Sequence, residues 1–168
     1  VVYFKDKTKS YISLKYTKSQ TVGALEVTKN SFAEFFNDEK LTKSISKYEE
    51  TEYSSKLFKN IFHQESVDFE EYISKNQKKY LKYVLCGTGK NLPPDTIIFL
   101  DKKNNYLYIS SVDEYINILL KYGGKGTFNT YTNLTRTSKT HNLKIKVANP
   151  IRIKKFKQNI NYWSNYSI

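Results

Sequence analysis

With 168 residues, 39% of them hydrophobic, the chain is long enough for one domain with a substantial core, and no apolar run approaches the ~20 residues that span a bilayer. No signal-peptide pattern opens the sequence and its single cysteine, Cys86, cannot form an internal disulfide, so we expect a cytoplasmic protein. The formal net charge is +12, and the 54 residues from Tyr115 to Ile168 contain ten Lys or Arg and no Asp or Glu. Such one-sided charge is costly unless a polyanion neutralises it, which favours nucleic acid as a partner.

The chain opens with a predicted β-hairpin. Val1–Phe4 is β-branched and aromatic, Lys5–Ser10 has the composition of a turn, and Tyr11–Lys15 reads as the returning strand. Apolar residues at helical spacing then predict three helices, of which the first begins at a capping box, Ser31–Glu34, and the last ends at Gly87.

A second hairpin and a basic strand region follow. Thr96–Leu100 and Tyr106–Ser110 are the predicted strands of the hairpin, and Asp113–Leu120 is a short helix. Apolar and basic residues then alternate through 143–156, as they do in strands. We expect one domain over residues 1–168, of α/β class with α+β as the alternative, in which helices flank a mixed central β-sheet.

The first hairpin is the best place in the sequence for phosphodiester chemistry. A metal-dependent nuclease site on a sheet puts an Asp at the start of one strand and a (D/E)-x-K triplet on the next, where the two outer side chains share a face. Ser13-Leu14-Lys15 occupies the triplet position with Ser in place of the acid, and the expected Asp would fall at or just before Val1. A lysine that closes an apolar strand is equally often a solvated edge residue. In the second hairpin, Asp101-Lys102-Lys103 lies in the predicted turn, which favours an ordinary hairpin there.

Two stretches of the chain resemble type II restriction endonucleases of the PD-(D/E)xK superfamily. The first, VVYFKDKTKSYISLKYTKSQTVGALEV, shows an Asp-side strand, a returning strand ending in S-x-K and a polar segment before a helix. The second, NNYLYISSVDEYINILLKYGGKGTFNTYTNLTRTSKTHNLKIKV, is similar to the part of these enzymes where a hairpin and short helix precede a Gly/Ser/Thr-rich basic segment that reaches DNA.

The resemblance implies a restriction-endonuclease-like fold and Mg²⁺-dependent, site-specific cleavage of double-stranded DNA. Lys15 would be the catalytic lysine, Ser13 the altered acid position, and the carbonyl of Leu14 a metal ligand. Glu26, expected at the entry to the following helix, is a candidate for a displaced catalytic and metal-binding acid. The chain would be the C-terminal major part of such an enzyme, and a homodimer and a separate N-terminal segment stay open.

The segment from Gly123 to His141 is the predicted DNA-contacting region. Arg136 is the best candidate to read a base, because its planar guanidinium matches the O6 and N7 edge of guanine. The further candidates for DNA binding are polar or basic residues in and near this segment and just after the first hairpin: Lys18, Gln20, Lys125, Thr127, Asn129, Thr132, Asn133, Ser138, Lys139 and His141. Lys144, Lys146, Arg152 and Lys154 are expected to meet phosphates or water.

Two other functions compete with an endonuclease. A nucleic-acid-binding domain without catalysis is favoured by Ser13 and by the missing Asp. A protein-interaction or structural domain from a lysine- and asparagine-rich genome would explain the lysines without any nucleic acid.

Overall fold

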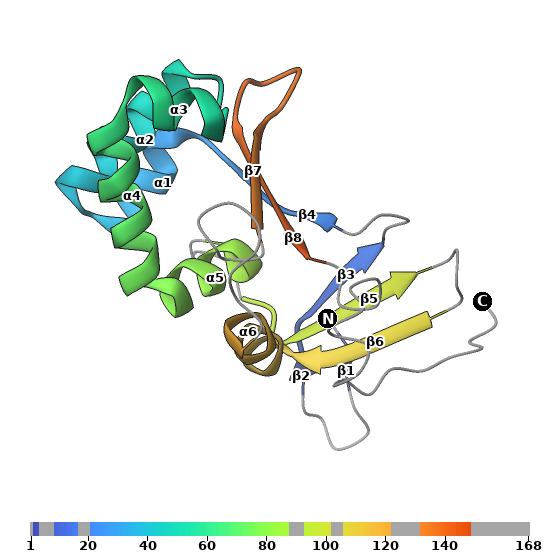
Figure 1. Ribbon diagram of the computed structural model, residues 1–168. Coiled ribbons are helices and arrows are strands. Elements are labelled where there is room, and N and C mark those ends of the chain that lie inside the picture. Colours follow the sequence, from blue (N-terminus) through green and yellow to red (C-terminus); the bar gives the residue numbers. More distant parts are fainter. Residues whose placement is uncertain are drawn as a thin grey trace.

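The computed structural model describes residues 2–3, 9–16, 21–87, 93–101, 106–121 and 132–148. In Figure 1 the helices between residues 29 and 75 gather on one side of the molecule, and the β-strands lie on the other. The described strands form one two-stranded and two three-stranded β-sheets. No helix within the described ranges has the length and apolar character needed to cross a membrane.

The first sheet is mixed, as the sequence predicted. Strand β1 (Val2–Tyr3) pairs antiparallel with β2 (Lys9–Ser10), so a hairpin is present at the N-terminal end of the described residues, but its returning strand is Lys9–Ser10 and not Tyr11–Lys15 as expected. The expected pairing of Lys15 with the start of the first strand is therefore wrong. The chain continues into β3 (Ile12–Tyr16), which pairs in parallel with β5 (Thr96–Asp101), and β5 pairs antiparallel with β6 (Tyr106–Ser111). The strand order β3-β5-β6 therefore places β3 beside the second predicted hairpin.

The second sheet contains a strand that the sequence analysis did not identify. Strand β4 (Thr21–Val27) pairs antiparallel with β8 (Leu143–Ala148), which pairs in turn with β7 (Thr132–Arg136). Residues 21–27 were expected to lead into a helix, with Glu26 at its entry, and this expectation is wrong. The chain stays extended here because its partner β8 lies more than a hundred residues later in the sequence.

Five helices, rather than the three expected, connect β4 to β5. They are α1 (Lys29–Phe36), α2 (Glu39–Glu50), α3 (Ser55–Ile61), α4 (His63–Lys75) and α5 (Gln77–Cys86). Local capping interactions divide the predicted helices into shorter ones. Asn37 takes a left-handed conformation that ends α1, and the Asp38 carboxylate accepts a hydrogen bond of 2.8 Å from the Leu41 amide to begin α2.

The first of these helices begins one turn earlier than the predicted capping box. Thr28 is the residue that caps α1, and its hydroxyl accepts a hydrogen bond of 3.1 Å from the Ser31 amide. Ser31 therefore lies inside the helix. The short helix expected after β6 is confirmed as α6 (Val112–Lys121).

Aromatic side chains form most of the core. In the helical region the buried rings pack edge-on or tilted with centroids between 4.8 and 6.3 Å apart, among them Phe32, Phe36, Tyr48, Phe58, Phe69 and Tyr83. Such arrangements place the positive edge of one ring against the negative face of the next. A smaller group, Phe99, Tyr108 and Tyr115, fills the space between the first sheet and α6.

Two tyrosine hydroxyls fasten the second sheet to the helices. Tyr80 on α5 shares a hydrogen bond of 3.0 Å with the hydroxyl of Thr132 on β7. Tyr115 on α6 donates a hydrogen bond to the carbonyl of Ala148 at the end of β8. Because each of these four residues is buried, the bonds hold β7 and β8 in a fixed position against the helical side of the molecule.

Candidate functional site

Ser13 and Lys15 lie on the same, inner face of β3. Leu14 between them is 64% exposed, and Tyr16 is also exposed, so these two side chains point to the opposite face. In the parallel register Lys15 lies beside Phe99, which is fully buried. The geometry expected for the two ends of a catalytic triplet is therefore present, with a hydroxyl in place of the carboxylate.

The inner face places Lys15 in a partly dry environment at the end of α5. Burial lowers the pKa of the Lys15 ammonium from its ordinary value, and the nearby Cys86 opposes part of this effect. Cys86, whose thiol influences Lys15, lines a cavity of about 380 Å³ together with Ser13 and Leu25. A lysine with a lowered pKa is a candidate for proton transfer, because it can release and take up a proton closer to neutral pH.

Cys86 serves the packing of this region. Its thiol is half-buried, burial raises its pKa, and its sulfur lies 3.7 Å from the carbonyl oxygen of Pro94 as a weak donor. A thiol with a raised pKa is a poor nucleophile. The structure thus agrees with the interpretation of Cys86 as a core residue.

Asp101 is the carboxylate that sequence reasoning missed. It was assigned to a turn, but it is the last residue of β5 and is fully buried. Residues 97, 99 and 101 alternate as the buried side of this strand, so Asp101 lies on the face that carries Lys15, two residues beyond Phe99. The alternation of apolar residues through 97–101 was the signal that could have extended the strand to this residue.

Asp95, at the opposite end of β5, has a structural role. Its carboxylate accepts hydrogen bonds from the Ser10 hydroxyl (2.5 Å), the Thr96 hydroxyl (2.8 Å) and the Tyr11 amide (3.2 Å). The bonds from Ser10 and Thr96 are the main reason why the pKa of Asp95 is lowered. These contacts fasten the junction of β2 and β3 to the start of β5.

Glu26 is not brought together with Lys15. It lies on β4 opposite Lys144 of β8, and its Oε1 accepts hydrogen bonds from the Thr140 hydroxyl (2.8 Å) and the Asn142 side-chain amide (3.5 Å). It lines a second cavity, of about 520 Å³, whereas Ser13 lines the first. The two predicted acid positions therefore face different surfaces of the protein.

The oxygen atoms on the Lys15 face of the first sheet are of the chemical type that binds a small divalent cation. Mg²⁺ prefers hard oxygen ligands and is held in many enzymes by one or two carboxylates together with substrate phosphates. The inner face of the first sheet offers the Asp101 carboxylate and the Ser13 hydroxyl. Within the described ranges, no group of three or more His, Cys, Asp or Glu side chains is close enough to hold a metal without such help.

The outer face of the second sheet is basic. Lys144 and Lys146 of β8 alternate with buried Leu143, Ile145 and Val147, as the sequence predicted. Across the strands, Lys144 lies between Glu26 and Thr135, and Lys146 lies between Gly23 and Asn133. Together with the turn residues Ser138, Lys139 and Thr140, they line the cavity of about 520 Å³.

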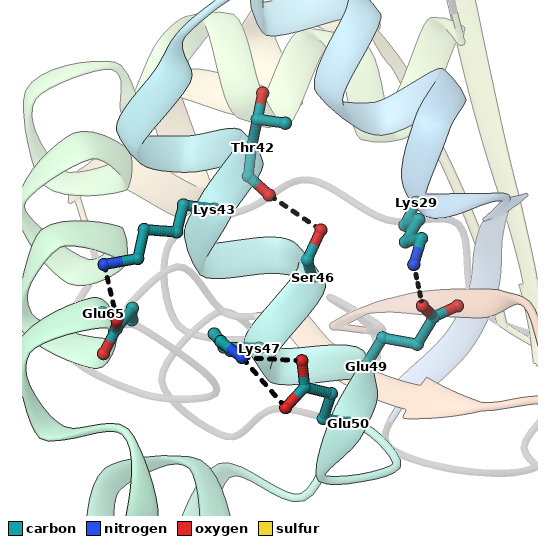
Figure 2. A network of polar contacts seen from close by, with 8 residues as sticks. All are labelled: Lys29, Thr42, Lys43, Ser46, Lys47, Glu49, Glu50 and Glu65. Atoms are coloured by element: carbon teal, nitrogen blue, oxygen red, sulfur yellow. Dashed lines mark hydrogen bonds and ion pairs between the residues drawn. The ribbon is translucent and has the colours of Figure 1, made fainter.

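The lysines of this face are not neutralised by the protein. Among the residues that the structure describes, no carboxylate forms an ion pair with Lys139, Lys144 or Lys146. Figure 2 shows the contrasting arrangement on the helices, where Lys43 reaches Glu65 at 2.9 Å and Lys29 reaches Glu49 at 2.6 Å. The basic outer face therefore keeps its charge available for an external anion.

Arg136, the predicted base-reading residue, is engaged within the protein. Its guanidinium forms an ion pair with Glu52, which lies in the turn between α2 and α3, and it also contacts Nδ1 of His141. Arg136 pairs in register with the buried Leu143, so it lies on the inner side of the second sheet. In this structure the side chain joins the end of β7 to the helices.

The other candidate DNA contacts differ in position. Ser138, Lys139 and His141 are exposed in the turn between β7 and β8, whereas Thr132 is buried in its bond with Tyr80. Asn133 lies on β7 in register with Lys146. The remaining candidates fall outside the described residues: Lys18, Gln20, Lys125, Thr127 and Asn129, together with Arg152 and Lys154.

Comparison with known proteins identifies the fold. No protein-family model matches the chain, and no curated protein matches it significantly. Among solved structures, the chain is similar to the restriction endonuclease MspI, whose crystal structure is in complex with its cognate DNA, with a TM-score of 0.69 and 18% sequence identity. The match covers 86% of this chain and 60% of the MspI chain, so the chain spans less than two thirds of that enzyme. The chain has a mixed α/β, restriction-endonuclease-like fold.

Proposed function

We propose that this protein is a type II site-specific deoxyribonuclease, which hydrolyses double-stranded DNA with Mg²⁺. One observation supports it most. Lys15, at the end of the S-x-K strand of a restriction-endonuclease-like fold, is half-buried and shares its sheet face with Ser13 and Asp101. MspI is solved with DNA, which makes duplex DNA the first substrate to test.

Each residue near Lys15 has a separate part in this proposal. Ser13 and the Leu14 carbonyl, together with phosphate oxygens of the substrate, are the groups that would hold Mg²⁺, and the bound ion would neutralise charge at the scissile phosphate. Asp101 lies four residues beyond Ile97, the register partner of Ser13, and is therefore too far along β5 to share this ion. In its neutral form, the Nζ amine of Lys15 would be the proton acceptor of this site. Because burial lowers its pKa, it can accept a proton from the attacking water more readily than an exposed lysine can.

The outer face of the second sheet is the proposed DNA-binding surface. Lys139, Lys144 and Lys146 are free of internal ion pairs within the described part of the chain, and would contact phosphates. Ser138, exposed in the turn, lines the same cavity, and its hydroxyl could donate a hydrogen bond to a phosphate or a base. The homodimer expected from the sequence stays a prediction, which analytical ultracentrifugation with and without DNA tests.

The decisive experiment compares cleavage with binding. Supercoiled plasmid is incubated with wild-type protein and with Lys15→Ala, each with Mg²⁺ and with EDTA, while binding to short duplexes is measured in Ca²⁺. We expect nicked or linear DNA only with wild type and Mg²⁺, and duplex binding by both proteins. Cleavage by Lys15→Ala at the wild-type rate would reject the catalytic role of this face.

A nucleic-acid-binding domain without catalysis is the second candidate. It is favoured by Ser13 in the acid position and by the absence of a group of three metal-binding side chains among the described residues. The same experiment separates the two functions, because a binding domain would retain duplexes at moderate salt and leave the plasmid intact with Mg²⁺.

A further inference from the structure

Glu26 is an acidic side chain in the middle of a basic surface. It is exposed on β4, faces Lys144 across the strand pair, and lines the same cavity as Lys139 and Lys146. Within the described residues it forms no ion pair with any of these lysines. A carboxylate at this place repels the phosphates that the lysines attract, so it weakens binding to the DNA backbone unless another group on the DNA compensates for it.

The two carboxylate oxygens of Glu26 are in different situations. Oε1 accepts hydrogen bonds from Thr140 and Asn142, which orders the turn between β7 and β8 against β4. Oε2 has no hydrogen-bonding partner among the residues that the structure describes. The side chain is thereby oriented by the turn, and one acceptor stays open toward the cavity.

The shape of this region suits the major groove of DNA. Strand β8 pairs with β4 on one side and with β7 on the other, so the β7–β8 ribbon extends beyond β4 only at its exposed turn, which Figure 1 shows beside α3 at one extremity of the molecule. A two-stranded ribbon fits into the major groove, where the base edges offer hydrogen-bond donors and acceptors. Glu26 lies on the strand next to this ribbon and contacts its turn.

The chemistry of an open carboxylate oxygen selects one base. An ionised carboxylate only accepts hydrogen bonds, so it favours a base edge that donates. Cytosine presents its N4 amino group alone in the major groove, whereas adenine presents an amino group next to the N7 acceptor, which repels a carboxylate. Guanine and thymine present acceptors at the corresponding positions.

We propose that Glu26 reads a cytosine in the recognition sequence by accepting a hydrogen bond from its N4 amino group through Oε2. The inference rests on the proposed function, because it requires a DNA duplex on the basic face. It makes Glu26 a specificity-determining residue rather than the metal-binding acid expected from the sequence.

The substitution Glu26→Gln tests this role with little change in shape. The Gln carbonyl can still accept from Thr140 and Asn142, which leaves the amide NH₂ directed to where Oε2 was. Wild type, Glu26→Gln and the control Glu50→Gln are each used to select duplexes from a randomised pool. Glu50 pairs with Lys47 on α2, so the control removes the same charge from the helical region.

We expect wild type and Glu50→Gln to prefer the same sequence, with a cytosine at one position where Glu26→Gln loses its preference. The loss of discrimination is about tenfold or more, the usual size for one good base contact. At that position Glu26→Gln shifts toward thymine or guanine, because their acceptors match the new donor.

A second test uses the wild-type protein and is therefore independent of how the variant folds. N4-methylcytosine keeps its pairing with guanine but replaces the hydrogen that faces the major groove. Placed at the identified position, it is expected to weaken binding about tenfold, while the same base outside the recognition sequence has no effect.

Three results would overturn the inference. Unchanged base preferences in Glu26→Gln would show that Glu26 only orders the turn, and binding without any base preference in wild type would exclude a reading role; in both cases the proposed DNA-binding function survives. Absence of any duplex binding by wild type would instead reject the proposed function together with this inference.

Discussion

The lysines of the helices and the lysines of the second sheet differ in what surrounds them. On the helices, five lysines form ion pairs with glutamates, namely Lys29, Lys43, Lys47, Lys59 and Lys75. The first three of these pairs are drawn in Figure 2. On β8 and the adjoining turn, Lys139, Lys144 and Lys146 have no ion pair within the described residues. A genome-wide enrichment in lysine would not by itself separate the lysines into paired and unpaired groups by their place in the fold. The helical lysines are thus paired with glutamates, whereas the lysines of β8 and its turn form no ion pair with any described residue even though Glu26 lines the same cavity.

Lys15 belongs neither to the paired lysines of the helices nor to the unpaired lysines of the second sheet. Its substitution is expected to have the largest effect, which is on DNA cleavage. It is half-buried without a carboxylate among the causes of its pKa shift. Lys15→Ala should lower the rate of Mg²⁺-dependent plasmid cleavage by roughly a hundredfold or more, the range found for removal of a proton-transferring group. Duplex affinity, measured by fluorescence anisotropy, should stay within about twofold of wild type, since a single charge contributes little to the whole interface. Loss of affinity with normal cleavage would place Lys15 in the DNA-binding surface instead.

The next largest effect is expected at the unpaired lysines of β8. In the double variant Lys144→Ala/Lys146→Ala, two phosphate contacts disappear. The slope of log K against log salt should therefore become less negative by about two, at about 0.9 for each contact. A salt titration of binding measures this slope directly. An unchanged slope would show that these lysines face water in the complex.

Lys15 also links stability to pH, with a smaller effect. Its pKa in the folded protein is lower than in the unfolded chain because burial disfavours the ammonium. The unfolded state therefore binds more protons, so this group makes the free energy of unfolding rise with pH. The cost of burying the charged ammonium is present in full below the pKa of the folded state. It is absent above the ordinary pKa of 10.5. Lys15→Met should have a higher denaturation midpoint than wild type at pH 7, and the difference should shrink as the pH rises toward 10. Lys56→Met, at an exposed position, should show no such trend.

The smallest effect is expected from the paired lysines. Lys43 lies 2.9 Å from Glu65, and the bond between them raises the pKa of Lys43 and lowers that of Glu65. Because its charge is already matched, Lys43→Ala should change duplex affinity by less than about twofold and leave the salt slope as it is. A loss equal to that of the Lys144 variants would end the distinction between the two sets of lysines.

Local sequence patterns predicted the elements that local forces determine. The second hairpin and α6 follow from alternation, turn composition and helical spacing, and both are present in the structure. The strand near Tyr11–Lys15 is also present, but it pairs in parallel with β5 and not with the first strand, because pairing with a distant strand is not visible in a local pattern. Strand β4 was missed because its polar and small residues become a strand only through pairing with β8. Asp101 was missed because a short polar residue beside lysines and asparagines reads as a turn until the register with β3 is known.

The candidate site was predictable to a similar degree. The shared face of Ser13 and Lys15 follows from the two-residue period of a strand. The partners of Arg136 and Glu26 do not follow from any local rule, because Glu52 is 84 residues away from Arg136 and Thr140 is 114 residues away from Glu26. Which charges are neutralised is therefore a property of the tertiary structure, although the number of charges is visible in the sequence.

The pairing of distant strands also determines when the two three-stranded sheets can form during translation. Strand β3 has no parallel neighbour until β5 leaves the ribosome, and the partner of Val27 on β4 is Leu143, which is 143 − 27 = 116 residues later. A nascent chain that ends before residue 132 contains Lys15 but lacks β7 and β8, so it has no basic sheet with which to hold a duplex. Contacts between residues so far apart in the sequence form slowly during folding.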